Sequence, residues 1–155
     1  MPTPNDAVIQ SQEELDTIAR LQAGIAAFNL KQFGAAEPTP IQIAWNRIKT
    51  ERDRRIQQGG YKVGTKWYHS DTFSRTQQMG LVMLGANIPA NTPWKTMDGS
   101  FVIMTQTLAG QIFAAAAASD IAIFTAAEAH RTAMEASQDP ASYNFASGWP
   151  SIYGE

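Results

Sequence analysis

Residues 97–124, MDGSFVIMTQTLAGQIFAAAAASDIAIF, join a tight turn directly to a long helix-forming segment. The turn signal is Asp98-Gly99, the strongest in the chain, because a type I′ hairpin needs positive φ at both central residues. Thr105 is a suitable N-cap for a helix over about 106–136, in which five alanines follow one another. Alanine has the highest helix propensity, and its small side chain lets a neighbouring backbone approach closely. We therefore predict a hairpin that leads directly into a closely packed final helix.

The final helix is predicted to carry one apolar face. Four residues fall within a narrow arc at 3.6 residues per turn: Leu108, Ile112, Ile123 and Met134. Phe113 and Phe124 extend this face to one side. We expect the helix to run unbroken, with Asp120 at its solvent edge. In the hairpin before it, Trp94 and Phe101 suit strands, and we expect them to form a small apolar platform for the helix.

An earlier hairpin is predicted in the sequence YKVGTKWY, where Gly64 begins a two-residue loop that suits a type II′ turn. Ser70 and Asp71 then offer a natural N-cap for a helix that continues to Leu84. The run His69-Ser70-Asp71 contains a base, a nucleophile and an acid, but the members of real catalytic triads converge from separate segments. We therefore interpret Ser70 and Asp71 as a helix cap.

Two further helices are predicted ahead of the hairpins. The first begins with a capping box, Ser11 with Glu14, and carries an apolar stripe at helical spacing: Leu15, Ile18, Leu21, Ile25 and Phe28. This stripe suits either a core face or a short coiled-coil seam. The second begins with Thr39 and Gln42 as a capping box and has Pro40 at its first position. Its apolar stripe consists of Ile41, Trp45, Ile48 and Ile56, and Gly59-Gly60 ends the helix.

The second helix also contains a run of charged residues from Arg47 to Arg55, with five basic and two acidic side chains. Such a run is compatible with phosphate contacts or with a solvated face that holds internal pairs, such as Glu51 with Arg55. No aromatic side chains are interleaved with these charges, as they are in many nucleic-acid footprints. We favour the solvated face.

The composition excludes several classes of protein. There is no cysteine, so disulfides, thiolate zinc sites and cysteine nucleophiles are ruled out. A formal net charge of −2 gives no general attraction to nucleic acid or to an anionic membrane. The N-terminus lacks the pattern of a secretory signal, and the least polar stretch, 112–127, is shorter than the ~20 residues of a membrane span. We expect a soluble protein without a nucleic-acid or membrane partner.

No residue pattern predicts catalysis or metal binding. His69 and His130 are the only histidines, and a metal site at His130 would need a second ligand three or four residues away on the same helical face. We expect His130 to be a hydrogen-bonded structural or interfacial residue. Glu128 and Glu135 bracket Arg131 and are expected to pair with it. Phosphate-binding glycine motifs do not occur. We therefore predict no catalytic, cofactor-binding or metal-binding residues, no cofactor, no small-molecule substrate and no enzymatic activity.

These elements together predict a helix-rich α+β fold. We expect an N-terminal helical extension (1–38), a compact α+β domain (39–138) and an aromatic C-terminal segment (139–155). In the domain, two β-hairpins are expected to form a small antiparallel sheet packed on the long Ala-rich C-terminal helix. The predicted core consists of Trp45, Ile48, Trp67, Phe73, Leu81, Leu84, Trp94, Phe101, Ile103, Leu108, Ile112 and Ile123.

From about residue 47 to 136 the chain resembles a domain of unknown function that recurs in tail-fibre and tail-fibre-assembly proteins of bacteriophages and prophages. The resemblance rests on a charged helix, then YKVGTKWYHSD and a short helix, then the hairpin WKTMDGSFVIM, then a Thr-capped Ala-rich helix ending EAHRTAMEA. It is carried by the order of the elements and by a few anchor residues, and it contains no catalytic signature. The N-terminal extension and the C-terminal segment lie outside it.

This resemblance implies a non-enzymatic tail protein that docks on other proteins. The favoured interpretation is a structural component of the tail tip, baseplate or tail fibre, located in the virion and made in the host bacterial cytoplasm. One alternative is an assembly chaperone that folds or attaches the fibre, and a second is a non-viral protein-interaction module. The expected partners are other phage tail proteins, fibre or baseplate subunits, and a second copy of the chain.

The flanking regions carry the residues that we expect to contact partners. At the N-terminus these are the middle of the apolar stripe: Leu21, Ile25 and Phe28. At the C-terminus they are aromatic: Tyr143, Phe145, Trp149 and Tyr153. The C-terminal segment is too aromatic for a purely disordered end, so we expect it to pack back on the domain or to dock on a partner.

Overall fold

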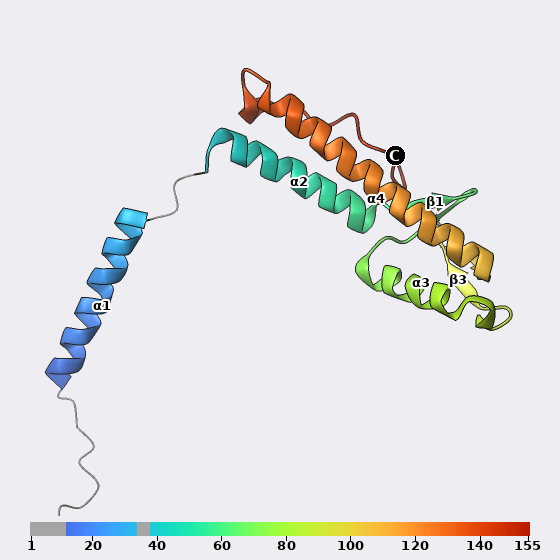
Figure 1. Ribbon diagram of the computed structural model, residues 1–155, viewed down its shortest axis with the longest axis horizontal. Helices are drawn as coiled ribbons and strands as arrows, with labels where there is room; N and C mark the ends of the chain where they lie inside the picture. The colour runs from blue at the N-terminus through green and yellow to red at the C-terminus, as the bar shows by residue number, and fades with distance from the viewer. Residues whose placement is uncertain (1–11, 34–37) are drawn as a thin grey trace, which may run out of the picture. The chain divides into compact units, whose positions relative to one another are not determined.

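The computed structural model describes residues 12–33 and 38–155, which fall in two compact units, Met1–Pro38 and Thr39–Glu155. The first unit contains helix α1 (Gln12–Phe33) (Figure 1). The expected cap Ser11 lies outside the described residues. Large apolar side chains along α1 are between 38 and 62% exposed: Leu15, Ile18, Leu21, Ile25 and Phe28. The apolar stripe is therefore present on a helix but does not form part of a core.

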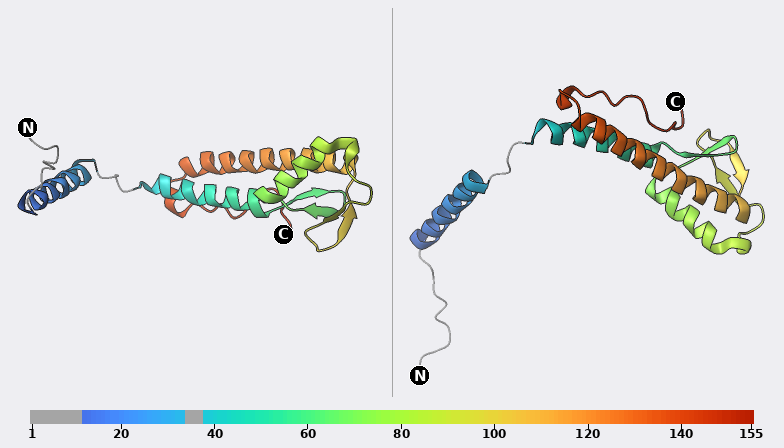
Figure 2. Two further views of the ribbon diagram at one scale, coloured as in Figure 1. Left: turned by 90° about the horizontal axis from the view of Figure 1, so that it is seen from below. Right: turned by 45° about the horizontal axis from the view of Figure 1, so that its top comes forward.

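The second unit has the predicted helix-rich α+β architecture. Its main elements are α2 (Pro40–Gln58), β1 (Tyr61–Val63), β2 (Lys66–Tyr68), α3 (Thr72–Leu84), β3 (Pro93–Lys95), β4 (Phe101–Ile103) and α4 (Gln106–Glu135), with short 3₁₀ turns η1 (Gly85–Asn87) and η2 (Pro140–Ser142). Helix α4 contacts α2, α3 and β1. Both views of Figure 2 show α2 and α4 side by side, so α4 is the element on which the others pack.

The predicted helix caps are confirmed. Thr39 and Gln42 form the full capping box of α2, with Pro40 at its start. The Asp71 carboxylate accepts the Ser74 N–H at the start of α3, and Thr105 Oγ1 accepts the Leu108 N–H at the start of α4. Each cap satisfies a backbone N–H that has no partner within its own helix. Helix α4 is unbroken, as expected.

Each predicted hairpin forms its own two-stranded antiparallel sheet, β1–β2 and β3–β4. The two hairpins do not form the single sheet that was expected. They are connected by a hydrogen bond in which the Met97 N–H donates to the Trp67 carbonyl at 2.9 Å. In the first hairpin Gly64 has φ +60°, as its predicted turn position requires. The two hairpins are thus adjacent without forming a continuous ladder.

The turn of the second hairpin differs from the predicted two-residue type I′ loop. The Gly99 N–H donates to the Thr96 carbonyl and the Thr96 N–H to the Ser100 carbonyl, which makes a three-residue loop with Gly99 at φ +82°. The Asp98 carboxylate accepts hydrogen bonds from the Thr96 and Ser100 hydroxyls and pairs with Lys66 of the first hairpin at 2.7 Å. These contacts, first of all the one from Lys66, hold the pKa of Asp98 well below its usual range.

The prediction that Trp94 and Phe101 form one apolar platform is correct for Trp94 and wrong for Phe101. The strand register pairs Trp94 with Val102 and Lys95 with Phe101. Directly opposed residues of an antiparallel pair point to the same face. Trp94 and Val102 therefore pack together against the core, whereas Phe101 lies on the other face and is exposed.

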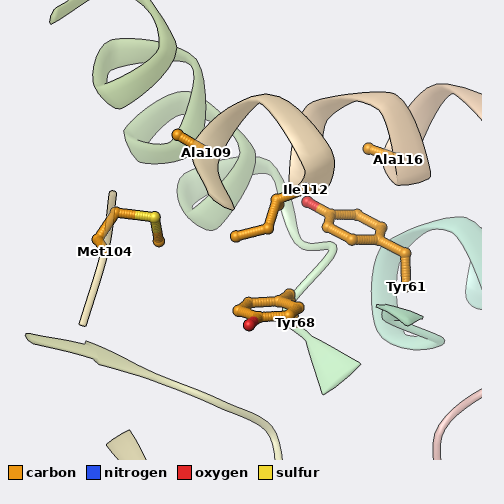
Figure 3. Packing of buried hydrophobic residues seen from close by; sticks show 6 residues of the cluster. All are labelled: Tyr61, Tyr68, Met104, Ala109, Ile112 and Ala116. Atoms are coloured by element: carbon orange, nitrogen blue, oxygen red, sulfur yellow. The ribbon is translucent and has the colours of Figure 1, made fainter. Parts of the chain in front are cut away.

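The core of the second unit consists of two clusters. The first joins the first hairpin to the start of α4 and contains Tyr61, Tyr68, Met104, Ala109, Ile112 and Ala116. Figure 3 shows Ile112 pointing from α4 toward the ring of Tyr68, with Tyr61 next to Ala116. The second joins α2 to the end of α4 and contains Ala44, Ile48, Ala127 and Met134. Alanine occupies both clusters, which agrees with the close approach predicted for α4.

Part of the predicted core is exposed. Ile48, Ile112 and Ile123 are buried, and five further predicted core residues are partly buried. Ile41 of the predicted α2 stripe is exposed, as are four predicted core residues: Phe73, Leu84, Phe101 and Ile103. On α3 the buried position is Gln78, whose side-chain amide donates to the His69 carbonyl and accepts a hydrogen bond from the Tyr61 hydroxyl. A polar residue therefore anchors α3, and Phe73 points away from the core.

Candidate docking site

The residues that a catalytic interpretation would use have structural partners. The Ser70 hydroxyl accepts the Gly60 N–H at 2.9 Å and is buried. The Asp71 carboxylate accepts the N–H and the hydroxyl of Ser74, and the pKa of Asp71 is lowered by these hydrogen bonds. Ser70 and Asp71 thus connect the first hairpin to α3, as the cap interpretation predicted. Within the described part of the chain, no cluster of three or more His, Asp or Glu side chains could hold a metal ion.

The charged residues of α2, α3 and α4 form pairs within the domain. Arg75 binds both carboxylate oxygens of Asp120, at 2.6 and 2.8 Å, and also donates to the Ser70 carbonyl. The predicted pairs are present: Glu51 with Arg55, and Arg131 with Glu128 and Glu135. Asp120, expected at the solvent edge, is thereby the link between α3 and α4.

The aromatic C-terminal segment packs on its own domain. Tyr143, Phe145 and Trp149 are half-buried against the cluster formed by α2 and the end of α4. Arg47 of α2 donates to the Ala141 carbonyl, and its guanidinium lies 5.2 Å from the centre of the Phe145 ring. Of the two outcomes that the sequence left open for this segment, packing back on the domain is the one observed.

His130 is at the centre of this aromatic cluster and is 8% exposed. Its Nδ1 and the Tyr143 hydroxyl form a 3.1 Å hydrogen bond, which confirms the expected hydrogen-bonded structural histidine. The rings of Phe145 and Trp149 also lie within 6.5 Å of the imidazole ring. Burial lowers the pKa of His130; the Ser147 backbone opposes this effect to a smaller extent. His130 Nε2 is buried and has no hydrogen-bond partner among the described residues.

Arg55 fastens the end of the C-terminal segment to α2. Its side chain is buried, donates to the Pro150 carbonyl and pairs with Glu155 at 2.8 Å. The Tyr153 N–H donates to the Gly59 carbonyl, and the Tyr153 ring stacks edge-on against Trp67. Of the four aromatic residues expected to contact partners, Tyr153 is the most exposed, at 40%.

A pocket of about 220 Å³ opens between α3 and α4. We call it the α3–α4 pocket. It is lined by Tyr61, Thr72, Arg75, Thr76, Gln78, Met79, Phe113 and Ala116. Met79 and Phe113 are about half exposed at this pocket, although both have large apolar side chains. Such a surface is typical of sites that receive an apolar side chain of another protein.

The α3–α4 pocket could not be predicted from the sequence. Its residues come from β1, α3 and α4, so they meet only after the domain has folded. Phe113 was recognised as an extension of the apolar face of α4, and this was the one available signal. The alanine at position 116 leaves the space into which the pocket extends.

Helix α4 is also unusually long and apolar. By length and composition α4 is the described helix that is long and apolar enough to cross a membrane, and 17% of its most apolar stretch is buried within the protein. Its inward face, however, carries Ile112 and Ile123, which are almost completely buried within the domain. Leaving the domain for a lipid bilayer would expose the partners of these residues. The long apolar sequence of α4 is thus used, on one face, for packing inside the domain.

One family model, described as Domain of unknown function (DUF4376), matches residues 40–147. The match begins at the first residue of α2 and extends to the residue before Gly148. It includes the residues that line the α3–α4 pocket together with His130, Tyr143 and Phe145, and it excludes α1 and Trp149. No curated protein and no solved structure matches the chain.

Proposed function

The chain belongs to the family of the domain of unknown function DUF4376. We propose that it is a non-enzymatic docking protein of a bacteriophage tail. Its role is that of a structural component of the tail tip, baseplate or tail fibre. The phage context rests on the sequence resemblance described above. The docking role is supported by the surfaces of the domain.

The observation that carries this proposal is the α3–α4 pocket with its two half-exposed apolar side chains. Polar contacts within the lining hold the pocket in shape: Arg75 pairs with Asp120 of α4, and the Tyr61 hydroxyl donates to Gln78. Pre-formed pockets lined by aromatic and apolar side chains are characteristic of protein interaction hot spots. We therefore assign the pocket to an apolar anchor residue of a fibre or baseplate subunit.

A second candidate is an assembly chaperone that binds the fibre only during assembly. Exposed methionines on α3 favour this alternative, since Met83 is 83% exposed and Met79 lines the pocket. Methionine side chains are flexible and suit surfaces that bind several conformations of a partner. A non-viral interaction module would use the same pocket, with a partner outside a phage.

Mass spectrometry of purified virions tests the proposal. A structural component is expected in the virion at a fixed stoichiometry relative to the fibre or baseplate subunits. Absence from virions that nevertheless need the gene for fibre attachment would replace the structural role by the chaperone role. Intact, infectious virions from a phage that lacks the gene would refute both roles. A matched sample from the complemented deletion controls for loss during purification.

A further inference from the structure

Helix α1 presents an apolar stripe that its own unit leaves uncovered. The five large apolar side chains along α1, from Leu15 to Phe28, are between 38 and 62% exposed. A single helix of this length has little stability in water without a packed face. Gly24 weakens it further, because glycine lowers helix propensity and no neighbouring atom within 4 Å accounts for the missing side chain. The helix needs a partner surface.

The spacing of the stripe indicates what that surface is. Ile18, Leu21, Ile25 and Phe28 are separated by three, four and three residues, which is the a and d pattern of a two-helix seam. The charged residues Asp16 and Arg20 fall at positions that face away from this seam. Knobs at a and d positions pack into holes formed by another helix with the same repeat. A second copy of α1 satisfies this requirement.

We propose that α1 pairs in antiparallel orientation with α1 of a second copy of the chain. In the matching register, Ile18 lies opposite the partner's Phe28 and Leu21 lies opposite the partner's Ile25. Both layers then join an a position to a d position. A two-fold axis repeats each contact, so the interface is complementary to itself.

Charge distinguishes the antiparallel orientation from the parallel one. Glu14 and Asp16 lie near the start of α1, and Lys31 lies in its last turn. The antiparallel register brings Lys31 beside the partner's Glu14, whereas a parallel pair places the two copies of Glu14 beside one another. The opposite charges at the two ends therefore specify the orientation.

This pairing is independent of the proposed tail function and has its own test. Light scattering of the full-length chain over a concentration series is expected to give twice the chain mass. Ile25→Glu places a charge in the seam and is expected to shift the protein to monomer, whereas Ala23→Glu, on the opposite face of α1, leaves the dimer intact. A wild-type monomer at every concentration, or a dimer that survives Ile25→Glu, would overturn the proposal.

Engineered cysteines test the orientation, because the natural chain contains none. A mixture of the Ile18→Cys chain and the Phe28→Cys chain is expected to form a disulfide-linked heterodimer under mild oxidation. Each chain alone is expected to cross-link poorly. Efficient self-linking of the Ile18→Cys chain would show a parallel pair and contradict the antiparallel register. Circular dichroism of each variant verifies that the helices of the second unit remain folded.

Discussion

The indole ring of Trp149 lies 4.8 Å from the imidazole ring of His130, centre to centre, at an interplanar angle of 37°. The Arg55 guanidinium lies 5.4 Å from the centre of the same indole ring. The indole N–H donates to the Phe145 carbonyl at 2.7 Å, which fixes the ring within the C-terminal segment. Trp149 thus connects α4, α2 and the C-terminal segment.

Replacing Trp149 by alanine is expected to lower the free energy of unfolding by about 2 kcal/mol. Truncation of a fully buried tryptophan costs roughly 3–5 kcal/mol, and Trp149 is only half-buried. Urea unfolding followed by circular dichroism measures the change. Trp149→Phe retains most of the ring contacts and is the matched control. A loss below about 0.5 kcal/mol for the alanine variant would mean that the C-terminal segment contributes little to stability.

His130 predicts a dependence of stability on pH. Because burial lowers the pKa of His130 in the folded protein, the unfolded chain binds the proton first as the pH falls through about 6.5. Stability therefore rises with pH between the folded pKa and the unfolded value and is constant above it. The groups facing His130, Tyr143 on the C-terminal segment and Arg55 beyond Trp149, offer no carboxylate to stabilise the charged ring.

The measurement compares wild type with His130→Gln by urea unfolding from pH 5 to pH 7.5. The wild type is expected to lose stability toward pH 5 with a slope of at most about 1.4 kcal/mol per pH unit, the limit for one proton. The glutamine variant is expected to have a lower free energy of unfolding at every pH, and this free energy is expected to change less between pH 5 and pH 7.5. Equal slopes for the two proteins would exclude His130 as the group responsible.

The parts of the fold that follow from neighbouring residues were predictable. Thr39, Asp71 and Thr105 cap their helices because a side-chain oxygen and an unpaired N–H lie within three residues of each other. The positions that depend on distant contacts were not. Phe73 was expected in the core, but Gln78 takes the inward position on α3 because Tyr61 and His69 provide its hydrogen bonds.

The position of the C-terminal aromatic residues also depends on distant contacts and could not be predicted from neighbouring residues. The aromatic residues of the C-terminal segment were recognised as contact residues, and the structure places Tyr143, Phe145 and Trp149 against His130 of their own domain. No short-range pattern encodes that destination. Their role toward a partner stays a prediction, and Tyr153 is the member whose exposure best suits it.

Gly60 is expected to be intolerant of substitution. It has φ +69°, and an added Cβ would clash with Met97 Sδ and lie 2.9 Å from the Tyr68 carbonyl oxygen. Gly64 has a similar φ of +60° but open space around it, so Gly64→Ala is the matched control. We expect Gly60→Ala to destabilise the protein by about 3 kcal/mol and Gly64→Ala by about 1 kcal/mol. Equal losses in thermal unfolding would mean that φ strain alone, without the steric contact, determines the effect.

Arg55 and Glu155 are expected to be energetically coupled. The two side chains form two hydrogen bonds, at 2.8 and 3.0 Å, and Arg55 is buried while Glu155 is nearly half exposed. Solvent screening at Glu155 reduces the coupling to about 1 kcal/mol. A double-mutant cycle with Arg55→Met and Glu155→Gln measures it. Arg55→Met alone has a larger effect, because it also removes the hydrogen bond to the Pro150 carbonyl. Additive single effects would show that the pair does not hold the segment.

The α3–α4 pocket predicts a variant that folds normally but fails to assemble. Phe113 is 52% exposed at the pocket, so Phe113→Glu is expected to change the free energy of unfolding by no more than about 0.5 kcal/mol. A carboxylate there would oppose the entry of an apolar anchor, because a charge cannot be buried without a partner. In a complemented phage, mass spectrometry should find at least tenfold less of this variant in virions. Gln111→Glu adds the same charge at an exposed position of α4 outside the pocket and should be incorporated normally. Normal incorporation of Phe113→Glu would place the docking surface elsewhere on the domain.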